Sequence, residues 1–353
     1  MKIDFLMSSL IGGGAERVLV TLANGLAEQH NIKVITFNEG LAYQLSKKID
    51  KVNLHGGVIS NHTIRSVFNL LGYYTNRRNK PDVLIAFLPS NSLIAIIVAK
   101  ILAIKVIVSE HTNHTAPSTK KKQRIRKYFY KYANATTVLT KFDYDYYKNF
   151  GANVVIMPNP LNLPSNCKPL SKRDKNILVA GSLNRYSNKG FDSFLKLMTP
   201  ILLNNPDWKI QVAGDGDDGL QILKNIALKN KINHQVEFLG FVKSMEKVYQ
   251  NSQIFVLSSK FEGLPMALME ALSNGVACVS YDCPSGPSEL INNSENGLLI
   301  PDQNSKAMQQ AIQSLVKDNE LRNILAYNAP NSMLKYGLDS ILKKWEELIL
   351  SIN

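Results

Sequence analysis

The chain has 353 residues, 45% of them hydrophobic and 20% charged, which is ordinary for a globular protein and argues against a disordered or fibrous one. At roughly 150 residues per domain, this length suggests two domains. The formal net charge is +13, and the three cysteines (Cys167, Cys278 and Cys283) have neither C-x-x-C nor metal-ligand spacing. The absence of such cysteine spacing favours a reducing compartment.

The N-terminal residues run directly from a short apolar stretch into a glycine-rich loop, which is unlike a signal peptide. The most hydrophobic stretch, 84–108, is interrupted by Pro89, Lys100 and Lys105. It is therefore predicted to be strand, helix and strand rather than a membrane span. We expect a cytoplasmic protein, attached peripherally to the inner face of the cell membrane.

Short apolar runs alternate with helical patterns through the first half. Strands are predicted at 3–7, 34–37, 83–87, 106–109, 137–139 and 154–157, with helices at 15–29 and 90–102. This alternation predicts βαβ units and a parallel sheet.

The first strand leads into the loop S-S-L-I-G-G-G-A-E-R-V (8–18). Its glycines, among them Gly13 and Gly14, let the backbone approach a ligand closely. The spacing matches neither the dinucleotide nor the Walker fingerprint. A flexible turn without a ligand is the alternative interpretation.

The strand at 106–109 is followed by S-E-H-T-N-H (109–114). His111 lies at the carboxyl end of that strand, on the side where such sheets bind ligands. A structural histidine is an equally good interpretation, and Glu110 and His114 are weaker candidates.

Residues 120–148 contain nine Lys/Arg and eight aromatic residues against two aspartates. This composition suits an anionic membrane surface. A solvated helix face with inward-packed aromatic rings is almost as good an interpretation, and nucleic acid, which suits it least, is not expected as a partner.

A linker rich in Pro, Asn and Ser is predicted near 160–173. Strands are then predicted at 177–180, 210–213, 236–239, 254–258, 276–280 and 298–300. The sequence thus predicts two doubly wound α/β domains, 1–165 and 172–325. A helical segment, 326–353, follows, and the sequence leaves open whether it crosses back to the N-terminal domain.

Two cations follow the strand at 177–180, within G-S-L-N-R-Y-S-N-K-G-F-D (181–192). Arg185 and Lys189 at that edge could clamp a diphosphate and stabilise charge on a leaving group. Two ordinary solvated charges are the alternative.

Two glutamates, Glu262 and Glu270, bracket the predicted start of a helix from Leu264 to Asn274, with Pro265 as a first helical residue and Gly275 as the stop. The unpaired N–H groups there suit a phosphate, and the carboxylates suit sugar hydroxyls. Acidic residues near a helix start are, however, also favoured by the helix dipole alone.

These motifs together resemble the family 4 glycosyltransferases, which are retaining, nucleotide-sugar-dependent enzymes. The resemblance covers both halves: G-G-A-E-R, E-H-T-N, M-P-N-P (157–160), N-K-G-F-D, V-A-G-D-G, and the E-x7-E segment followed by D-C-P-S-G-P-S-E-L-I. It implies the GT-B fold, with two Rossmann-like domains facing a central cleft. The chain most resembles bacterial enzymes of capsule, O-antigen or lipid-linked oligosaccharide assembly.

The resemblance also implies roles for individual residues. Gly13 and Gly14 would line the donor phosphates, and His111 would lie near the transferred sugar. Lys189 and Arg185 would hold the diphosphate, Glu262 the sugar and Glu270 the ribose, with the helix start contributed by Gly263, Leu264, Pro265 and Met266. The family often has an arginine where this chain has Ser182, and Arg185 is expected to replace it.

The implied reaction transfers a hexose or N-acetylhexosamine, with retention, from a nucleotide sugar to a lipid-linked saccharide. A UDP donor is preferred and GDP stays open; no cofactor and no metal are expected. Two D-x-D strings, Asp143/Asp145 and Asp215/Asp217, are poor metal sites because one lies on a predicted helix and the other in a turn. A nucleotide-sugar 2-epimerase and a non-catalytic partner of a transferase are the alternatives.

Overall fold

A computed structural model describes residues 1–352, which divide into two compact units. The first unit comprises Met1–Pro160 and the C-terminal helix α14 (Leu338–Ser351), and the second comprises Leu161–Gly337. The boundaries at 165 and 172 expected from sequence thus lie inside the second unit. The segment 326–353 is divided between the two units at Gly337.

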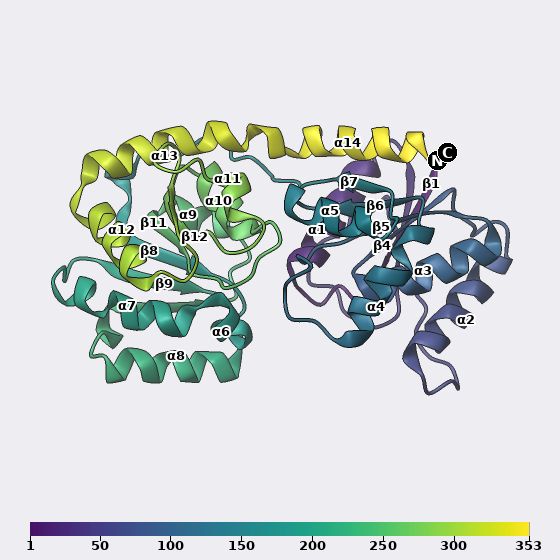
Figure 1. The fold of residues 1–353 in the computed structure, drawn as a ribbon, viewed down its shortest axis with the longest axis horizontal. Coiled ribbons are helices and arrows are strands. Elements are labelled where there is room, and N and C mark those ends of the chain that lie inside the picture. Colours follow the sequence, from purple (N-terminus) through teal and green to yellow (C-terminus); the bar gives the residue numbers. More distant parts are fainter. Residues whose placement is uncertain (353) are drawn as a thin grey trace. The chain divides into compact units, whose positions relative to one another are not determined.

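The first unit is built on seven parallel strands in the order β3-β2-β1-β4-β5-β6-β7 (Figure 1). The strands are β1 (Lys2–Met7), β2 (Asn31–Thr36), β3 (Asp50–Asn53), β4 (Val83–Phe87), β5 (Lys105–Ser109), β6 (Ala135–Val138) and β7 (Val154–Ile156). The order of the strands reverses between β1 and β4.

Helices cover both faces of this sheet. One hydrophobic core joins the strands to α2 (His62–Thr75), α3 (Pro89–Leu102), α4 (Lys120–Tyr128) and α5 (Lys141–Asn149). On α1 (Gly14–Leu26), a side chain at Gly25 would come within 2.5 Å of Leu342, so α1 and α14 pack closely together.

The second unit has six parallel strands in the order β10-β9-β8-β11-β12-β13. This is the strand order of the dinucleotide-binding doubly wound fold. The strands are β8 (Asp174–Ala180), β9 (Lys209–Ala213), β10 (Val236–Gly240), β11 (Ser252–Leu257), β12 (Ala277–Tyr281) and β13 (Leu298–Ile300).

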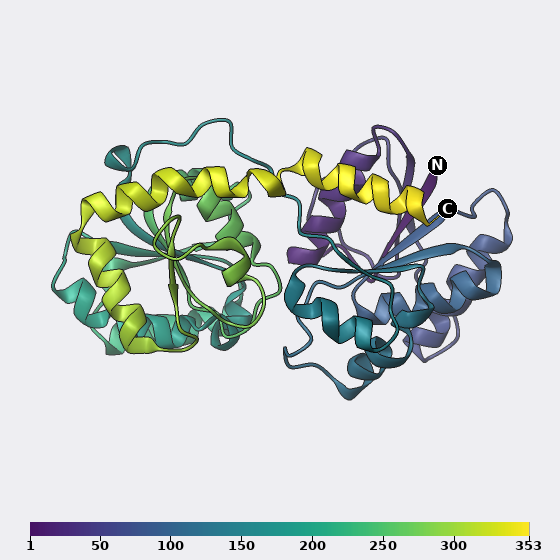
Figure 2. The same cartoon turned by 45° about the horizontal axis from the view of Figure 1, so that its top comes forward.

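Helices lie on both sides of the second sheet (Figure 2). A single core joins the strands to α7 (Phe191–Leu203), α8 (Asp217–Lys229) and α12 (Ser305–Lys317). The remaining helices are α6 (Tyr186–Lys189), α9 (Met245–Gln250), α10 (Met266–Ser273), α11 (Pro287–Leu290) and α13 (Asn319–Met333).

The predicted strands are confirmed: β4 and β13 match to the residue, and the others differ by one to a few residues at their ends. The stretch 84–108 is strand, helix and strand, and no helix within residues 1–352 is long and apolar enough to cross a bilayer. Strand β3 was not predicted, because its sequence D-K-V-N is mostly exposed at the sheet edge and carries no apolar run.

Candidate active site

The strand order locates the functional edge of each sheet. In doubly wound sheets, ligands bind beyond the carboxyl ends of the strands, at the point where the order reverses. In the second unit this point lies between β8 and β11. The loops that follow Ala180 and Leu257 contain Lys189 and Glu262.

Lys189 and Glu262 form an ion pair at this point. Lys189 Nζ lies 2.7 Å from Glu262 Oε1, and the two side chains are 19% and 12% exposed. Charges with so little solvent around them interact more strongly than a surface pair. The pair therefore fixes a cation and a carboxylate at the place where a ligand is expected.

Backbone contacts hold the two loops together. Ser258 Oγ donates a hydrogen bond to the Lys189 carbonyl at 2.8 Å, and Lys260 N donates to the Asn188 carbonyl at 2.9 Å. Gly190 has a φ of +68°, and a Cβ there would lie 2.1 Å from the Ser258 carbonyl oxygen. Only glycine allows this approach, which positions Lys189 beside the loop of Glu262.

Helix α10 begins later than predicted. Its first residue is Met266, and Pro265 precedes the helix with a ψ of 105°, so the predicted start at Leu264 is wrong. The helix ends before Gly275, whose φ of +62° fits the predicted stop. Leu268 N donates to the Pro265 carbonyl at 3.1 Å, so the N–H groups of Met266 and Ala267 are those that the helix leaves for an anion.

The loop after β12 packs against this helix start. A Cβ at Gly286 would lie 2.4 Å from the Gly263 carbonyl oxygen and 2.4 Å from Pro265 Cδ. This contact fixes the conformation of the segment that leads from Glu262 into α10.

The other two predicted donor-site residues differ in burial. Glu270 is 8% exposed, and its Oε2 accepts a hydrogen bond from Tyr249 Oη at 3.0 Å. Arg185 is exposed at the end of a short 3-10 helix, Leu183–Arg185. Within residues 1–352 the Arg185 guanidinium has no ion-pair partner, so the structure joins Lys189, and not Arg185, to Glu262.

In the first unit, the glycine loop follows β1 at the reversal of strand order. α1 begins at Gly14, one residue before the predicted start, and Gly12 has a φ of +128°. A Cβ at Gly13 would lie 2.3 Å from Glu16 Oε2, whereas nothing lies within 4 Å of a Cβ at Gly14. The Glu16 carboxylate therefore lies close to the Gly13 backbone, on the side where a side chain would project.

His111 is held at the carboxyl end of β5. Its Nε2 lies 3.0 Å from Ser109 Oγ, and its ring stacks on Phe87 with centroids 4.8 Å apart. Ser109 Oγ accepts a hydrogen bond from Thr137 Oγ1. The Ser109 hydroxyl can therefore donate its own proton to His111 Nε2. Burial lowers the pKa of His111 to about 4, although a hydrogen bond with the Asn159 side chain opposes this shift. The imidazole is therefore neutral near pH 7.

The His111 pKa predicts a pH-dependent stability. Between about pH 4 and 6.5 the unfolded chain binds the proton and the folded chain does not. This contribution is complete above pH 6.5 and falls by about 3 kcal/mol as the pH drops through 4. Urea unfolding at pH 7 and pH 4.5 should show a smaller loss for His111→Gln than for the wild type. Equal losses would contradict the assignment.

Glu110 anchors the His111 loop from inside the unit. Its carboxylate, 2% exposed, accepts from Arg126 Nε at 2.8 Å and Arg126 Nη2 at 3.1 Å. The hydroxyls of Tyr130 and Tyr147 also donate to it, at 3.0 and 3.3 Å. The backbone N–H of His111 donates to the same carboxylate at 3.2 Å. Glu110 therefore positions the loop from the interior.

His114 pairs with Asp143 on α5. His114 Nδ1 and the His114 backbone N lie 2.7 and 2.8 Å from Asp143 Oδ1, and the ring stacks on Tyr146. Burial raises the pKa of the Asp143 carboxyl, while the two bonds from His114 lower it. Asp143 is 3% exposed and hydrogen-bonded to this histidine, which does not suit a D-x-D metal ligand.

In residues 1–352 no group of three His, Cys, Asp or Glu side chains could hold a metal ion.

The basic and aromatic residues at 120–148 divide between surface and interior. Arg126, Tyr130 and Tyr147 are buried, whereas Tyr128, Tyr132 and Phe142 are between 42% and 51% exposed. The exposed cations are Lys120, Lys121, Lys122, Arg124, Lys127, Lys131, Lys141 and Lys148. Part of the aromatic set is thus packed inward, as the alternative interpretation of this region expected, and the membrane surface stays a prediction.

Family models match both parts of the chain. Residues 12–164 match the model described as "Glycosyltransferase Family 4", and residues 166–332 match "Glycosyl transferases group 1". A Campylobacter jejuni protein is 31% identical over 365 residues, covering 100% of this chain and 99% of that protein. Its name is GalNAc-alpha-(1->4)-GalNAc-alpha-(1->3)-diNAcBac-PP-undecaprenol alpha-1,4-N-acetyl-D-galactosaminyltransferase. This chain belongs to glycosyltransferase family 4.

Other relatives and solved structures agree with this family. The amylovoran biosynthesis glycosyltransferase AmsD of Erwinia amylovora is 25% identical over 348 residues, covering 96% of each chain. Anabaena HepE in complex with UDP and glucose has a TM-score of 0.84 at 16% identity, covering 99% of this chain and 100% of that one. Sucrose-phosphate synthase from Thermosynechococcus elongatus has a TM-score of 0.83 at 15% identity, covering 99% and 98%. The fold is therefore GT-B, with two Rossmann-like domains.

The family motifs lie at the functional edge of each domain, but the supporting residues are outside them. Arg126 is one of the nine cations of 120–148, and nothing local distinguished it from Arg124, which also adjoins Ile125 but is exposed. Nothing local indicated Tyr249 as the partner of Glu270, because the two residues lie 21 positions apart.

Proposed function

We propose that this glycosyltransferase moves a hexose or N-acetylhexosamine, with retention, from a UDP-sugar to a lipid-linked saccharide in bacterial glycan assembly. The Lys189–Glu262 pair at the strand-order reversal carries this proposal. Its ammonium suits a diphosphate, and its carboxylate suits sugar hydroxyls. The N-terminus of α10, four residues beyond Glu262, adds N–H groups for the phosphate.

The named relatives support the choice of substrates. The Campylobacter jejuni relative is named for a saccharide on undecaprenyl diphosphate. A second Campylobacter jejuni relative, 26% identical over 350 residues, is also named for a diphospho-undecaprenol substrate. HepE was solved with UDP and glucose. Because the Lys189–Glu262 pair lies in the second domain, we propose that this domain binds the UDP-sugar and that the first binds the acceptor.

The proposed reaction is an exchange at the anomeric carbon. The bond from this carbon to the diphosphate oxygen breaks, and the acceptor oxygen bonds to it on the same face. The acceptor proton passes to the departing diphosphate oxygen, so no protein nucleophile is needed. Lys189 and the α10 N-terminus stabilise the negative charge on the leaving group without a metal ion. The neutral His111 imidazole contacts the sugar near the reacting carbon.

A nucleotide-sugar screen tests the activity. The protein is incubated with UDP-GalNAc, UDP-GlcNAc, UDP-glucose or GDP-mannose, with and without bacterial membrane extract. We expect UDP release from one UDP-sugar, at a rate that depends on the extract. No release from any donor would contradict the proposal, as would a donor isomerised without extract.

Two variants separate the proposed roles. Glu270→Ala should weaken UDP binding, because the carboxylate proposed for the ribose is lost. His111→Ala should reduce turnover with a smaller effect on UDP affinity. Full turnover in both variants would refute the site.

The exposed cations and aromatic rings of 120–148 are proposed to bind the anionic membrane surface that carries the acceptor. Lys120, Lys121 and Lys122 form the first turn of α4, where they are all exposed. Lys127 lies 5.4 Å from the Tyr128 ring centroid, and Lys131 lies 5.2 Å from that of Tyr132. Such pairs place a charge and an apolar ring together at the surface, as membrane interfaces require.

Liposome co-sedimentation tests this surface. Replacing Lys120, Lys121 and Lys122 with Glu should abolish most binding to vesicles that contain phosphatidylglycerol, since each cation near the surface contributes about 1 kcal/mol. The control reverses three exposed lysines of the second domain, Lys196, Lys224 and Lys229, and changes the net charge equally. Equal loss in both variants, or binding unaffected by salt, would contradict a local surface.

A further inference from the structure

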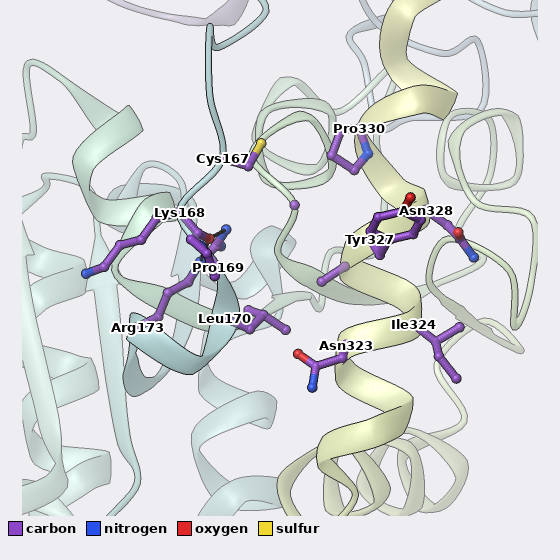
Figure 3. A pocket seen from close by; sticks show the side chains of 12 residues that line it. Cys167, Lys168, Pro169, Leu170, Arg173, Asn323, Ile324, Tyr327, Asn328 and Pro330 are labelled. Atoms are coloured by element: carbon purple, nitrogen blue, oxygen red, sulfur yellow. Dashed lines mark hydrogen bonds between the residues drawn. The ribbon is translucent and has the colours of Figure 1, made fainter.

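The second domain contains a pocket of about 750 Å³ away from the Lys189–Glu262 pair. Figure 3 shows it between the segment 167–173 and helix α13. Arg173 immediately precedes β8, and Gly275 lies two residues before β12. The pocket therefore lies at the amino ends of the strands, at the sheet edge opposite to the proposed donor site.

Arg173 gives this pocket a buried cation whose hydrogen-bond partners are neutral backbone carbonyls. The side chain is 6% exposed and donates hydrogen bonds to the carbonyls of Lys168, Tyr249, Ser252 and Asn274. No carboxylate within residues 1–352 forms an ion pair with it, and burial lowers its pKa to about 10. It is therefore still charged at neutral pH.

The lining of the pocket combines this charge with apolar surface. None of its twelve lining residues is Asp or Glu. The Lys168 side chain points away from α13, and its Nζ donates to Asn251 Oδ1 at 2.9 Å, so Arg173 is the cation nearest to the pocket among its lining residues (Figure 3). The apolar walls are formed by Pro169, Leu170, Ile324, Ala326, Tyr327 and Pro330. Tyr327 is 82% exposed and Ile324 is 48% exposed, so a ligand could cover substantial apolar area.

We propose that this pocket binds an amphipathic anion, a small molecule with one acidic head and an apolar chain or ring. Its volume lies within the range of small-molecule sites, about 300–1,000 Å³. The apolar body would lie against Ile324 and Tyr327, and the head would face Arg173. Because all five N–H groups of Arg173 already point to carbonyls, the guanidinium attracts the head through its charge.

The occupant would join the two chain segments that enter and leave the second domain. Leu161 N donates to the Tyr336 carbonyl at 2.8 Å, where these segments meet. One wall of the pocket follows a few residues after Leu161, and the other, α13, ends at Met333 just before Tyr336. Binding should therefore protect 167–170 and 323–330 from hydrogen exchange.

Titration calorimetry with octyl phosphate and octanol tests the ligand class. Octyl phosphate should bind at one site per chain, at least tenfold more tightly than octanol. Saturating UDP should leave its affinity unchanged. Ile324→Asp, which puts a negative charge on an exposed wall residue, should weaken octyl phosphate at least tenfold. Leu228→Asp, at a 62% exposed position on α8 outside the pocket, should bind like the wild type.

Three results would overturn the proposal. Equal affinity for octanol would refute the role of the charge, and unchanged binding by Ile324→Asp would refute the location. Competition with UDP would place the ligand in the donor site instead. None of these results affects the proposed function, because UDP binding is measured separately in the same protein.

Discussion

Replacing Lys189 with methionine should lower the rate of sugar transfer by about two to three orders of magnitude, the cost of removing one preorganised donor to a developing negative charge. The methionine keeps the length of the side chain but removes the ammonium that lies 2.7 Å from Glu262 Oε1. The remaining Glu262 carboxylate, 12% exposed, would then repel the diphosphate it lies beside. UDP release with membrane extract and saturating donor measures this effect.

The control for this variant is Lys196→Met on α7, where the side chain is exposed and away from the strand-order reversal. Its turnover should equal that of the wild type. If Lys189→Met also retains wild-type turnover, Lys189 does not stabilise the leaving group and the catalytic assignment fails.

Replacing Arg126 with methionine should destabilise the first domain by about 3–5 kcal/mol, because it leaves the Glu110 carboxylate buried without its cation. Glu110 is 2% exposed and Arg126 is 3% exposed, so water cannot replace the lost bonds without opening the core. The loop of His111 depends on the same carboxylate. Urea unfolding at pH 7 measures the change in the free energy of unfolding.

Two further variants separate a buried ion pair from a surface cation. Arg124→Met, on the same helix but exposed, should change the free energy of unfolding by less than about 0.5 kcal/mol. The double variant Arg126→Met with Glu110→Gln should recover part of the loss, since no unpaired charge remains. If Arg126→Met costs no more than Arg124→Met, the pair does not support the His111 loop.

The fold was largely predictable from the sequence because strands buried on both faces of a parallel sheet are continuous apolar runs. Val83–Phe87 is such a run and was predicted to the residue. β3 was not predicted because an exposed edge strand needs no apolar residues. The start of α10 was misplaced because Pro265, compatible with the first helical turn, here lies before it with an extended ψ.

The candidate site was predictable in its parts but not in its assembly. Lys189 and Glu262 were each predicted beyond the end of a strand, yet their contact depends on β8 and β11 being neighbours. Strand order is set by packing of the whole domain and has no local signal. The role of Glu110 was hidden for the same reason, since its partner Arg126 lies 16 residues away on another element. The placing of the two domains around a central cleft stays a prediction.

A crystal structure of the protein with UDP would locate the diphosphate. We expect it within hydrogen-bonding distance of Lys189 Nζ and of the first-turn N–H groups of α10, with the ribose at Glu270. A diphosphate bound elsewhere, with the Lys189–Glu262 pair undisturbed, would contradict the proposed donor site.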